Sequence, residues 1–320
     1  MALIRHLATR VAAALLTLVG ALVLLFAVIK LVPGDLISIM FGPRATPALR
    51  AEYAARMGTD QPVPVQLWLF LRRVAAGDLG ADVISGRPIA GMLADALPNT
   101  LQLAGAGLLL AMGLGLLLGV LAARHPGSWM DTVLGVASVA FITTPSFVVS
   151  IFLLLIFAIA LNLFPVTGAG DAGSVSDRLM HLVLPATALA IGWVGYLARL
   201  IRAALLEVMA EAHVRMLRAY GVPERRIVGR YALRLALIPM VSVMGIGVGD
   251  MISNAVFVEI IFSRPGIGSL IYNAIEDRNF PVVQAGILFT VLVYVSANLL
   301  VEVMNALLDP RIARTLREAG

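Results

Sequence analysis

One carboxylate lies in the middle of a long apolar stretch, and it is the first candidate for chemistry in this chain. Asp250 interrupts residues 235–258, which hold no other charged side chain. A charge at such a position in a bilayer costs at least about 2.5–3.5 kcal/mol. Asn254 follows one helical turn later, on the same side of a helix. Two interpretations stay open: the pair lines a solute path or contacts a cation, or it makes an interhelical hydrogen bond inside the bundle, for which Asp250 can be protonated.

A second polar group interrupts another apolar run. The sequence Thr-Thr-Pro-Ser occupies residues 143–146. A broken helix can line a cavity within a membrane protein, but proline kinks without a function are also common. We take Thr144 and Ser146 as candidates for the same solute path. The nearby aromatic residues Trp193 and Tyr196 are expected to serve packing only.

Several other chemistries are excluded or disfavoured. The chain has no cysteine, which excludes disulfides, thiolate zinc sites and cysteine nucleophiles. Its four histidines lie far apart in sequence, so we expect no metal site. Lys30 is the only lysine and precedes Leu31, so a Walker A phosphate loop is missing. We therefore expect no catalytic residues and no bound cofactor. Any ATP and Mg²⁺ would be used by other subunits.

The composition is that of a membrane protein. Sixty per cent of the 320 residues are hydrophobic and 13% are charged, whereas soluble domains have about 45–50% and about 25%. Lipid must cover the surplus apolar surface. The net charge of +5 comes from arginines. Because these arginines gather near the ends of the apolar runs, we attribute the positive charge to membrane orientation and not to nucleic acid binding.

The apolar runs predict an all-α polytopic protein with six transmembrane helices. A span needs roughly 20 apolar residues. Helices are the expected state, because an open sheet edge would leave backbone groups without hydrogen-bond partners in lipid. The first run lacks a signal-peptide cleavage pattern, so we expect it to be retained. The runs are Val11–Ile29, Leu101–Ala123, Thr132–Asn162, Leu182–Ala198, Leu235–Val258 and Phe280–Val301.

Arginine placement predicts that both termini are cytoplasmic. Arginines precede the first span, follow the second and sixth, and crowd the connection between the fourth and fifth. The predicted divisions are a cytoplasmic N-terminus with the first span (1–32), an external segment (33–98), a core of five spans (99–308) and a cytoplasmic tail (309–320). The external segment holds helical-looking stretches at 47–57 and 65–74, and a small folded cap is favoured over a catalytic domain.

The cytoplasmic connection 203–234 has a regular pattern that a passive tether would not need. Glu207, Glu211, Arg215 and Arg218 share one helical face, and Ala212, Met216 and Ala219 lie on an adjacent apolar face. We expect a Glu211–Arg215 ion pair. Gly221 is placed to end the helix. Such a helix either lies on lipid headgroups or inserts into a groove of a cytoplasmic partner.

This connection, with other segments, resembles a known family. The stretch 211–221, Glu-Ala-His-Val-Arg-Met-Leu-Arg-Ala-Tyr-Gly, followed by Leu237-Ile238-Pro239, looks like the EAA loop of binding-protein-dependent ABC importer permeases. Further pieces follow the B-type subunit of the dipeptide/oligopeptide/nickel group along nearly the whole chain. They are Pro33-Gly34-Asp35, Gly77-Asp78-Leu79-Gly80, Leu97-Pro98-Asn99-Thr100, Pro145-Ser146-Phe147, residues 262–268 (Phe-Ser-Arg-Pro-Gly-Ile-Gly) and Asp309-Pro310-Arg311.

The resemblance departs from the group's pattern at Ala212-His213, Leu217 and Tyr220, while Arg215, Arg218, Ala219 and Gly221 agree with it. It implies a type I importer permease in the bacterial inner membrane. It also implies two cytoplasmic ATPase subunits, a second homologous permease and an external solute-binding protein. The implied solutes are short peptides, nickel chelates or related small molecules. The ATPase-coupling residues would be Glu207, Glu211, Ala212, Arg215, Met216, Arg218, Ala219 and Gly221.

Two other functions fit a polytopic chain. An ion-coupled secondary transporter is expected to show inverted repeats and several paired intramembrane charges, whereas Asp250 is largely alone. A membrane-embedded enzyme needs a buried base or metal cluster, and no histidine lies centrally in a predicted span.

Overall fold

The computed structural model describes residues 2–31, 46–48 and 61–308, and over these ranges the chain is built from helices. One isolated β-bridge joins Ala81 and Pro88. The α-helices are α1 (Ala2–Leu31), α4 (Val63–Ala75), α5 (Ile89–Arg124), α6 (Trp129–Thr143), α7 (Ser146–Leu153), α8 (Val175–Ala210), α9 (Ala212–Ala219), α10 (Glu224–Arg226), α11 (Leu233–Ile261), α12 (Ile267–Glu276) and α13 (Phe280–Leu308). Two π-helical segments, η2 (Leu154–Ala160) and η3 (Ile227–Ala232), continue α7 and precede α11.

Five helical segments in the described part are long and apolar enough to span a membrane. They are α1, α5, α8, the continuous α10–η3–α11 segment and α13. A sixth span exists if α6 and α7–η2 count as one, although the two halves are bent by 104°. The all-α polytopic fold is confirmed. The run Thr132–Asn162 is not one straight helix, because Pro145 follows Thr144 in extended conformation and α7 begins anew.

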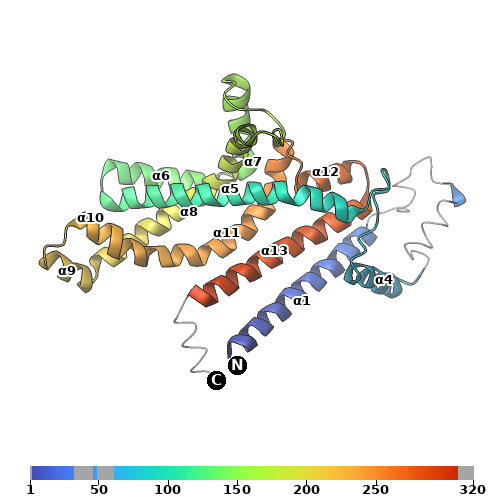
Figure 1. Ribbon diagram of the computed structural model, residues 1–320, viewed down its shortest axis with the longest axis horizontal. Helices are drawn as coiled ribbons and strands as arrows, with labels where there is room; N and C mark the ends of the chain where they lie inside the picture. The colour runs from blue at the N-terminus through green and yellow to red at the C-terminus, as the bar shows by residue number, and fades with distance from the viewer. Residues whose placement is uncertain (1, 32–45, 49–60, 309–320) are drawn as a thin grey trace.

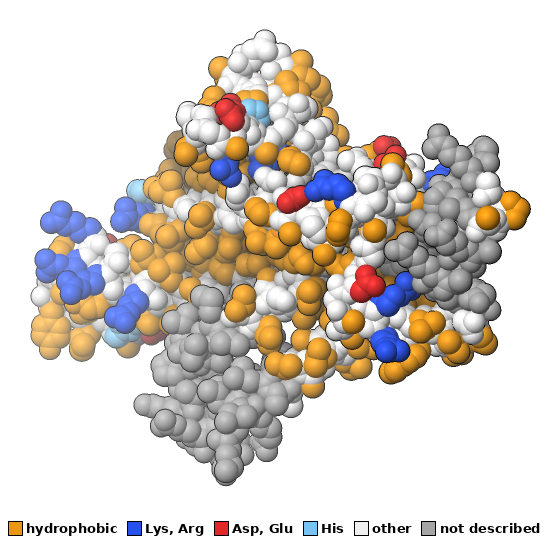
Figure 2. All heavy atoms as spheres, turned by 45° about the vertical axis from the view of Figure 1, so that its right-hand side comes forward, with side chains coloured by type: hydrophobic (Ala, Val, Ile, Leu, Met, Phe, Trp, Pro, Cys, Tyr) orange, Lys and Arg blue, Asp and Glu red, His pale blue; other side chains and the backbone are white. Residues whose placement is uncertain are grey.

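The long helices lie side by side between two different ends of the molecule. Figure 1 shows α5, α8 and α11 running together from an end that carries α9 and α10 to an end that carries α4 and α12. We call these the α9 end and the α12 end. In Figure 2 a hydrophobic surface covers the middle, and Lys and Arg side chains gather at the α9 end. This distribution matches a bundle whose middle faces lipid.

The tightest helix pair is α5 with α8, and glycine makes its close contact possible. A Cβ added to Gly119 would lie 2.7 Å from the backbone oxygen of Ala198 and 2.8 Å from Cβ of Ile201. A Cβ added to Gly115 would lie 2.7 Å from Leu197 Cβ. Small residues let helix backbones approach in membranes, where packing replaces the hydrophobic effect as the driving force. This contact fixes α8, which carries one wall of the cavity described below.

A buried carboxylate joins three helices at the α12 end. Glu259, near the end of α11, has no exposed surface. It accepts hydrogen bonds from Thr100 Oγ1 on α5 (2.6 Å) and from the backbone N–H groups of Gly268 (2.8 Å) and Ser269 (3.4 Å). The two amides belong to the first turn of α12, where a helix has unpaired N–H groups and favours an anion. The Glu259 carboxylate therefore serves as the cap of α12.

The turn between α11 and α12 is shaped around that carboxylate. A Cβ on Gly266 would lie 2.1 Å from Glu259 Cδ, so only glycine fits beside it. Thr100 Oγ1 also accepts the N–H of Ile267 (2.9 Å), and Asn99 Nδ2 donates to the oxygen of Pro265 (3.0 Å). Segments 97–100 and 262–268, which we singled out separately in the sequence, thus form one hydrogen-bonded unit.

A second polar anchor holds the loop before α5. The buried Asp82 accepts hydrogen bonds from Ser85, from the backbone of Ile84 and from Asn279, which directly precedes α13. Burial raises the pKa of Asp82, but these hydrogen bonds outweigh it and hold the pKa below its ordinary value. The loop is thereby fixed to the start of α13.

The predicted boundary at residue 98 falls inside a helix. Helix α5 begins at Ile89 and continues through Pro98. Ile89, Leu93 and Ala96 recur at helical spacing and are buried against α12 and α13, so packing offsets the cost of the internal proline. The helical stretch expected at 65–74 is present as α4. The stretch predicted at 47–57, most of the segment 33–60 and the tail 309–320 lie outside the described residues.

We predict that Gly119→Ala lowers the stability of the chain by about 1–3 kcal/mol, because the added methyl group must displace backbone of α8. Gly113→Ala is the matched control on the same helix, since a Cβ there meets nothing within 4 Å. Thermal unfolding in detergent measures both. Equal unfolding temperatures for the two variants would contradict the described α5–α8 contact.

We further predict that Thr100→Val destabilises the chain by about 1–3 kcal/mol, because the buried Glu259 carboxylate loses its hydroxyl donor while the side-chain shape is kept. Thr132→Val removes a hydroxyl that bonds only its own helix at an exposed site, and it should have little effect. The comparison uses the same unfolding measurement. A Thr100→Val protein as stable as Thr132→Val would show that the network has no energetic role.

Candidate functional site

A cavity of about 490 Å³ lies between α8, α11 and the break that separates α6 from α7. Four of its lining residues are those predicted for the solute path, namely Thr144, Ser146, Asp250 and Asn254. Two come from the Thr-Thr-Pro-Ser break and two from α11, more than 100 positions away along the chain. The structure therefore brings together polar groups that the sequence indicated separately.

Asp250 is held in place by an aromatic residue of the opposite helix. The indole Nε1–H of Trp193 on α8 donates to Asp250 Oδ2 at 2.8 Å. Trp193 itself packs edge-on against Tyr196, with ring centroids 5.6 Å apart. A Cβ on Gly247 would lie 3.2 Å from the Trp193 ring, so the absence of a side chain there lets the ring lie against α11. Trp193 and Tyr196 line the cavity, so the expectation that they serve packing only is incomplete.

The remaining walls combine backbone-bonded polar groups with aliphatic side chains. Thr144 Oγ1 donates to the oxygen of Ala140 (2.8 Å), and Asn254 Nδ2 donates to the backbone oxygen of Asp250 (3.0 Å). The aliphatic lining residues are Ile142, Leu189, Val243 and Ile246. Asp250 is the one charged residue among those that line this cavity. Such a mixed surface is typical of a small-molecule site.

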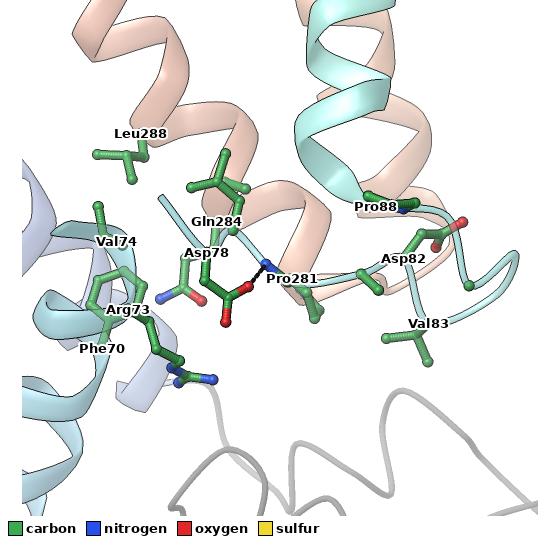
Figure 3. A pocket seen from close by; sticks show the side chains of 15 residues that line it. Phe70, Arg73, Val74, Asp78, Asp82, Val83, Pro88, Pro281, Gln284 and Leu288 are labelled. Carbon is green, nitrogen blue, oxygen red and sulfur yellow. Dashed lines mark hydrogen bonds between the residues drawn. The ribbon is translucent and has the colours of Figure 1, made fainter. Parts of the chain in front are cut away.

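A second and larger cavity, of about 580 Å³, lies at the α12 end. Figure 3 shows its walls, which come from α4, the loop 78–88 and α13, with Arg73, Asp78 and Gln284 among the lining side chains. Asp78 accepts the N–H of Gly80 at 2.9 Å, so its carboxylate stabilises a turn in the segment Gly77–Gly80. No predicted site residue lines this cavity, and it lies away from the facing walls of α8 and α11. We therefore treat the smaller cavity as the candidate site.

At the α9 end, the predicted amphipathic helix is divided into two. Glu207 belongs to the long helix α8, which ends at Ala210, and Glu211 adopts an extended conformation before α9. A single helix over 207–221 is thus a wrong expectation. Arginines explain the break: Arg215 donates to the oxygen of Ala210 (3.4 Å) and Arg218 to that of Met209 (3.5 Å). These contacts satisfy carbonyl groups at the end of α8.

Other polar contacts fix α9 against its neighbours. The predicted Glu211–Arg215 pair is replaced by a Glu211–His213 contact of 3.0 Å. Arg218 forms a two-point ion pair with Glu224 of α10, at 2.7 and 3.2 Å. Hydrogen bonding to Glu224 raises the pKa of Arg218 above its ordinary value. Arg218 therefore connects α8, α9 and α10 and holds the loop in shape.

Gly221 ends α9 as predicted. Its φ is +74°, and the N–H groups of Gly221 and Val222 bond back to the oxygens of Arg218 (2.9 Å) and Leu217 (3.1 Å). This is the Schellman arrangement that glycine permits. The positive φ explains why this residue type is needed here.

One face of α9 is buried and the other is exposed. Val214 is fully buried in the main core. The exposed side carries Ala212, Met216 and Ala219, which are spaced so that they share one helical face. Met216 has 55% of its surface accessible. Tyr220 extends this apolar face with 78% of its surface accessible. The apolar stripe predicted for a partner therefore points outward.

Some residues of structural importance were missed in the sequence. Glu259 and Thr100 are 159 positions apart, and no local pattern reveals their contact. Asp131 and Arg202 are a second case: Arg202 binds both carboxylate oxygens of Asp131 at 2.5 and 2.7 Å and connects α6 to α8. A carboxylate or an arginine inside an apolar run is the signal that could have marked Glu259 and Arg202.

Comparison with known proteins gives consistent matches over nearly the whole chain. Residues 115–314 match the binding-protein-dependent transport system inner membrane component, and residues 3–104 match its N-terminal part. The probable D,D-dipeptide transport system permease protein of Escherichia coli is 34% identical over 93% of this chain and 94% of its own length.

Two further relatives are similar to the same extent. The di/tripeptide transport system permease protein of Pseudomonas aeruginosa is 36% identical, over 92% of this chain and 95% of that protein. The glutathione transport system permease protein of Salmonella choleraesuis is 33% identical, over 92% of this chain and 94% of that protein. These matches confirm the resemblance drawn from the EAA-like loop and its companion segments. The chain belongs to the family of binding-protein-dependent transport system inner membrane components.

Proposed function

We propose that this chain is the transmembrane permease subunit of an ATP-driven ABC importer that moves short peptides across the bacterial inner membrane. The observation that carries the proposal is the position of α9. It lies between the ends of α8 and α10–η3–α11, the two helices that hold the Trp193–Asp250 contact of the cavity. A force applied at α9 would act on both walls of the proposed path.

The exposed stripe of Ala212, Met216 and Ala219 suits a groove in an ATPase subunit. Small alanines allow close approach, and the apolar surface is then removed from water. The arginine-rich surroundings favour a cytoplasmic position for this end. The arginines that precede the first span and follow the sixth in the sequence support cytoplasmic termini as part of the proposal. The Schellman turn and the Arg218–Glu224 pair make the helix a rigid contact element.

The remaining components of the system come from other polypeptides. Because Lys30 is the only lysine and no Walker A pattern surrounds it, ATP and Mg²⁺ would be bound by two separate ATPase subunits. The cavity is only partly enclosed, and a second homologous permease would complete it. An external solute-binding protein would deliver the solute. The relatives' names support di- and tripeptides or glutathione, and nickel chelates are an alternative cargo.

An ion-coupled secondary transporter is the competing function, and energy dependence separates the two. We predict that the complete complex in proteoliposomes takes up dialanine only when ATP is available to its ATPase subunits. A protonophore and a sodium ionophore should leave the initial rate unchanged within a factor of about two. Uptake without ATP that collapses with an ionophore would favour the secondary transporter.

We predict that Ala219→Asp abolishes ATPase association, because it buries an unpaired carboxylate in the proposed contact. The affinity should fall at least about tenfold, which corresponds to about 1.4 kcal/mol. Co-purification of the ATPase subunits with this chain provides the measurement. Ala76→Asp places the same charge at an exposed position beside α4, at the far end of the molecule, and should leave assembly intact. Normal assembly of Ala219→Asp would place the contact elsewhere.

A further inference from the structure

We propose that the α8–α11 cavity is a binding site for a primary ammonium group of the solute, with Asp250 as its charged partner. The inference rests on the proposed function in so far as the solute must pass this cavity. The first observation is charge: Asp250 is the one charged residue lining the cavity, and none of the ion pairs among the described residues includes it. An unneutralised carboxylate on a membrane-spanning helix favours a cation.

The second observation is the direction of the hydrogen bonds. Trp193 donates its only N–H to Asp250 Oδ2, Asn254 donates from Nδ2 to the backbone, and Thr144 donates its hydroxyl to Ala140. Each of these three groups therefore makes a hydrogen bond within the chain. The cavity offers acceptors at Asp250 Oδ1, Asn254 Oδ1 and the lone pairs of Thr144 Oγ1, and the hydroxyls of Ser146 and Tyr196 can donate or accept. A ligand that donates hydrogen bonds and carries positive charge, as an ammonium group does, suits the carboxylate and these acceptors.

Aromatic rings add a third contribution. Trp193 and Tyr196 stand edge to face at the cavity wall, at an interplanar angle of 73°. Their faces carry negative partial charge and attract ammonium groups within about 6 Å. A carboxylate bonded to Trp193, in a cavity that Tyr196 also lines, offers a cation both a charge partner and a surface that replaces water.

The same features favour an organic ammonium over a metal ion. In the described part of the chain, no group of three His, Cys, Asp or Glu side chains is placed to hold a metal. One carboxylate with neutral oxygens is a poor set of ligands for a divalent transition metal. The volume of about 490 Å³ far exceeds a single ion, and aliphatic residues such as Leu189 and Ile246 suit the carbon skeleton of a solute.

Thiol labelling tests this without requiring transport. The chain has no cysteine, so Ser146→Cys introduces its one thiol, on the cavity wall. The assembled complex, without binding protein, is treated with 2-aminoethyl or 2-sulfonatoethyl methanethiosulfonate, and the mass of this chain reports labelling. In the Ser146→Cys background, Asp250→Asn should lower the cationic-to-anionic rate ratio at least about tenfold, as expected for loss of a nearby charge.

Matched variants separate charge from structure. Asp250→Asn keeps the side-chain shape and an oxygen acceptor for Trp193, and Asp250→Glu should retain most of the cationic preference. Trp193→Phe removes the N–H that positions Asp250 and should lower the ratio by a smaller factor. Asp95→Asn removes an exposed carboxylate on α5 that pairs with Arg87 (3.0 Å), outside the cavity, and should not change the ratio.

Protection identifies the chemical class of the ligand. Dialanine, which has a free ammonium group, should slow labelling of Ser146→Cys at least twofold at saturation. N-acetyldialanine lacks that charge and should not protect. Protection by dialanine should disappear in Asp250→Asn.

Three results would overturn the inference: an unchanged rate ratio in Asp250→Asn, equal protection by both dipeptides, or no labelling of Ser146→Cys by either reagent. The last would show that the cavity is closed to solutes. None of these results depends on ATP-driven uptake. A complex that shows ammonium-dependent protection but no ATP-dependent flux would therefore contradict the proposed function while supporting this site.

Discussion

The buried carboxylate of Glu259 is the constraint on which the arrangement of the spans depends. It accepts hydrogen bonds from α5 and from the first turn of α12, and it belongs to α11. A buried carboxyl group is stable only when its hydrogen-bond partners are in place. The helix ends therefore cannot separate at the α12 end without leaving that group unpaired. Any large relative movement of α8 and α11 is more readily accommodated towards the opposite end.

The opposite end has the features that such a movement would require. α9 is linked to α8 through the extended Glu211 and to α11 through the Gly221 turn, α10 and the π-helical η3. Trp193 and Asp250 each lie 17 positions from the end of their helix that is nearer α9, which is about 25 Å at 1.5 Å per residue. The cavity thus sits between a fixed end and the proposed point of force, where a small tilt changes the separation of its walls.

Local patterns predicted much of this, and their limits are physical. Helical periodicity placed Asp250 beside Asn254 and Met216 beside Ala212 and Ala219, because those relations extend over one or two turns. Gly221 was identified from the special backbone conformation that glycine permits. The break at Glu211 was missed because it depends on arginines that reach back to carbonyls of α8. The Thr100–Glu259 contact was missed because it exists only once distant helices have packed.

The two interpretations of Asp250 that the sequence left open are compatible in the structure. Oδ2 makes the interhelical hydrogen bond expected of a structural residue, since Trp193 on α8 donates to it. The exposed side of the carboxylate faces a cavity with no cationic side chain in its lining. A single hydrogen bond from the indole orients the carboxyl group and uses one of its two oxygens. The structural contact therefore leaves Oδ1 available to a solute at the place where α8 and α11 face each other.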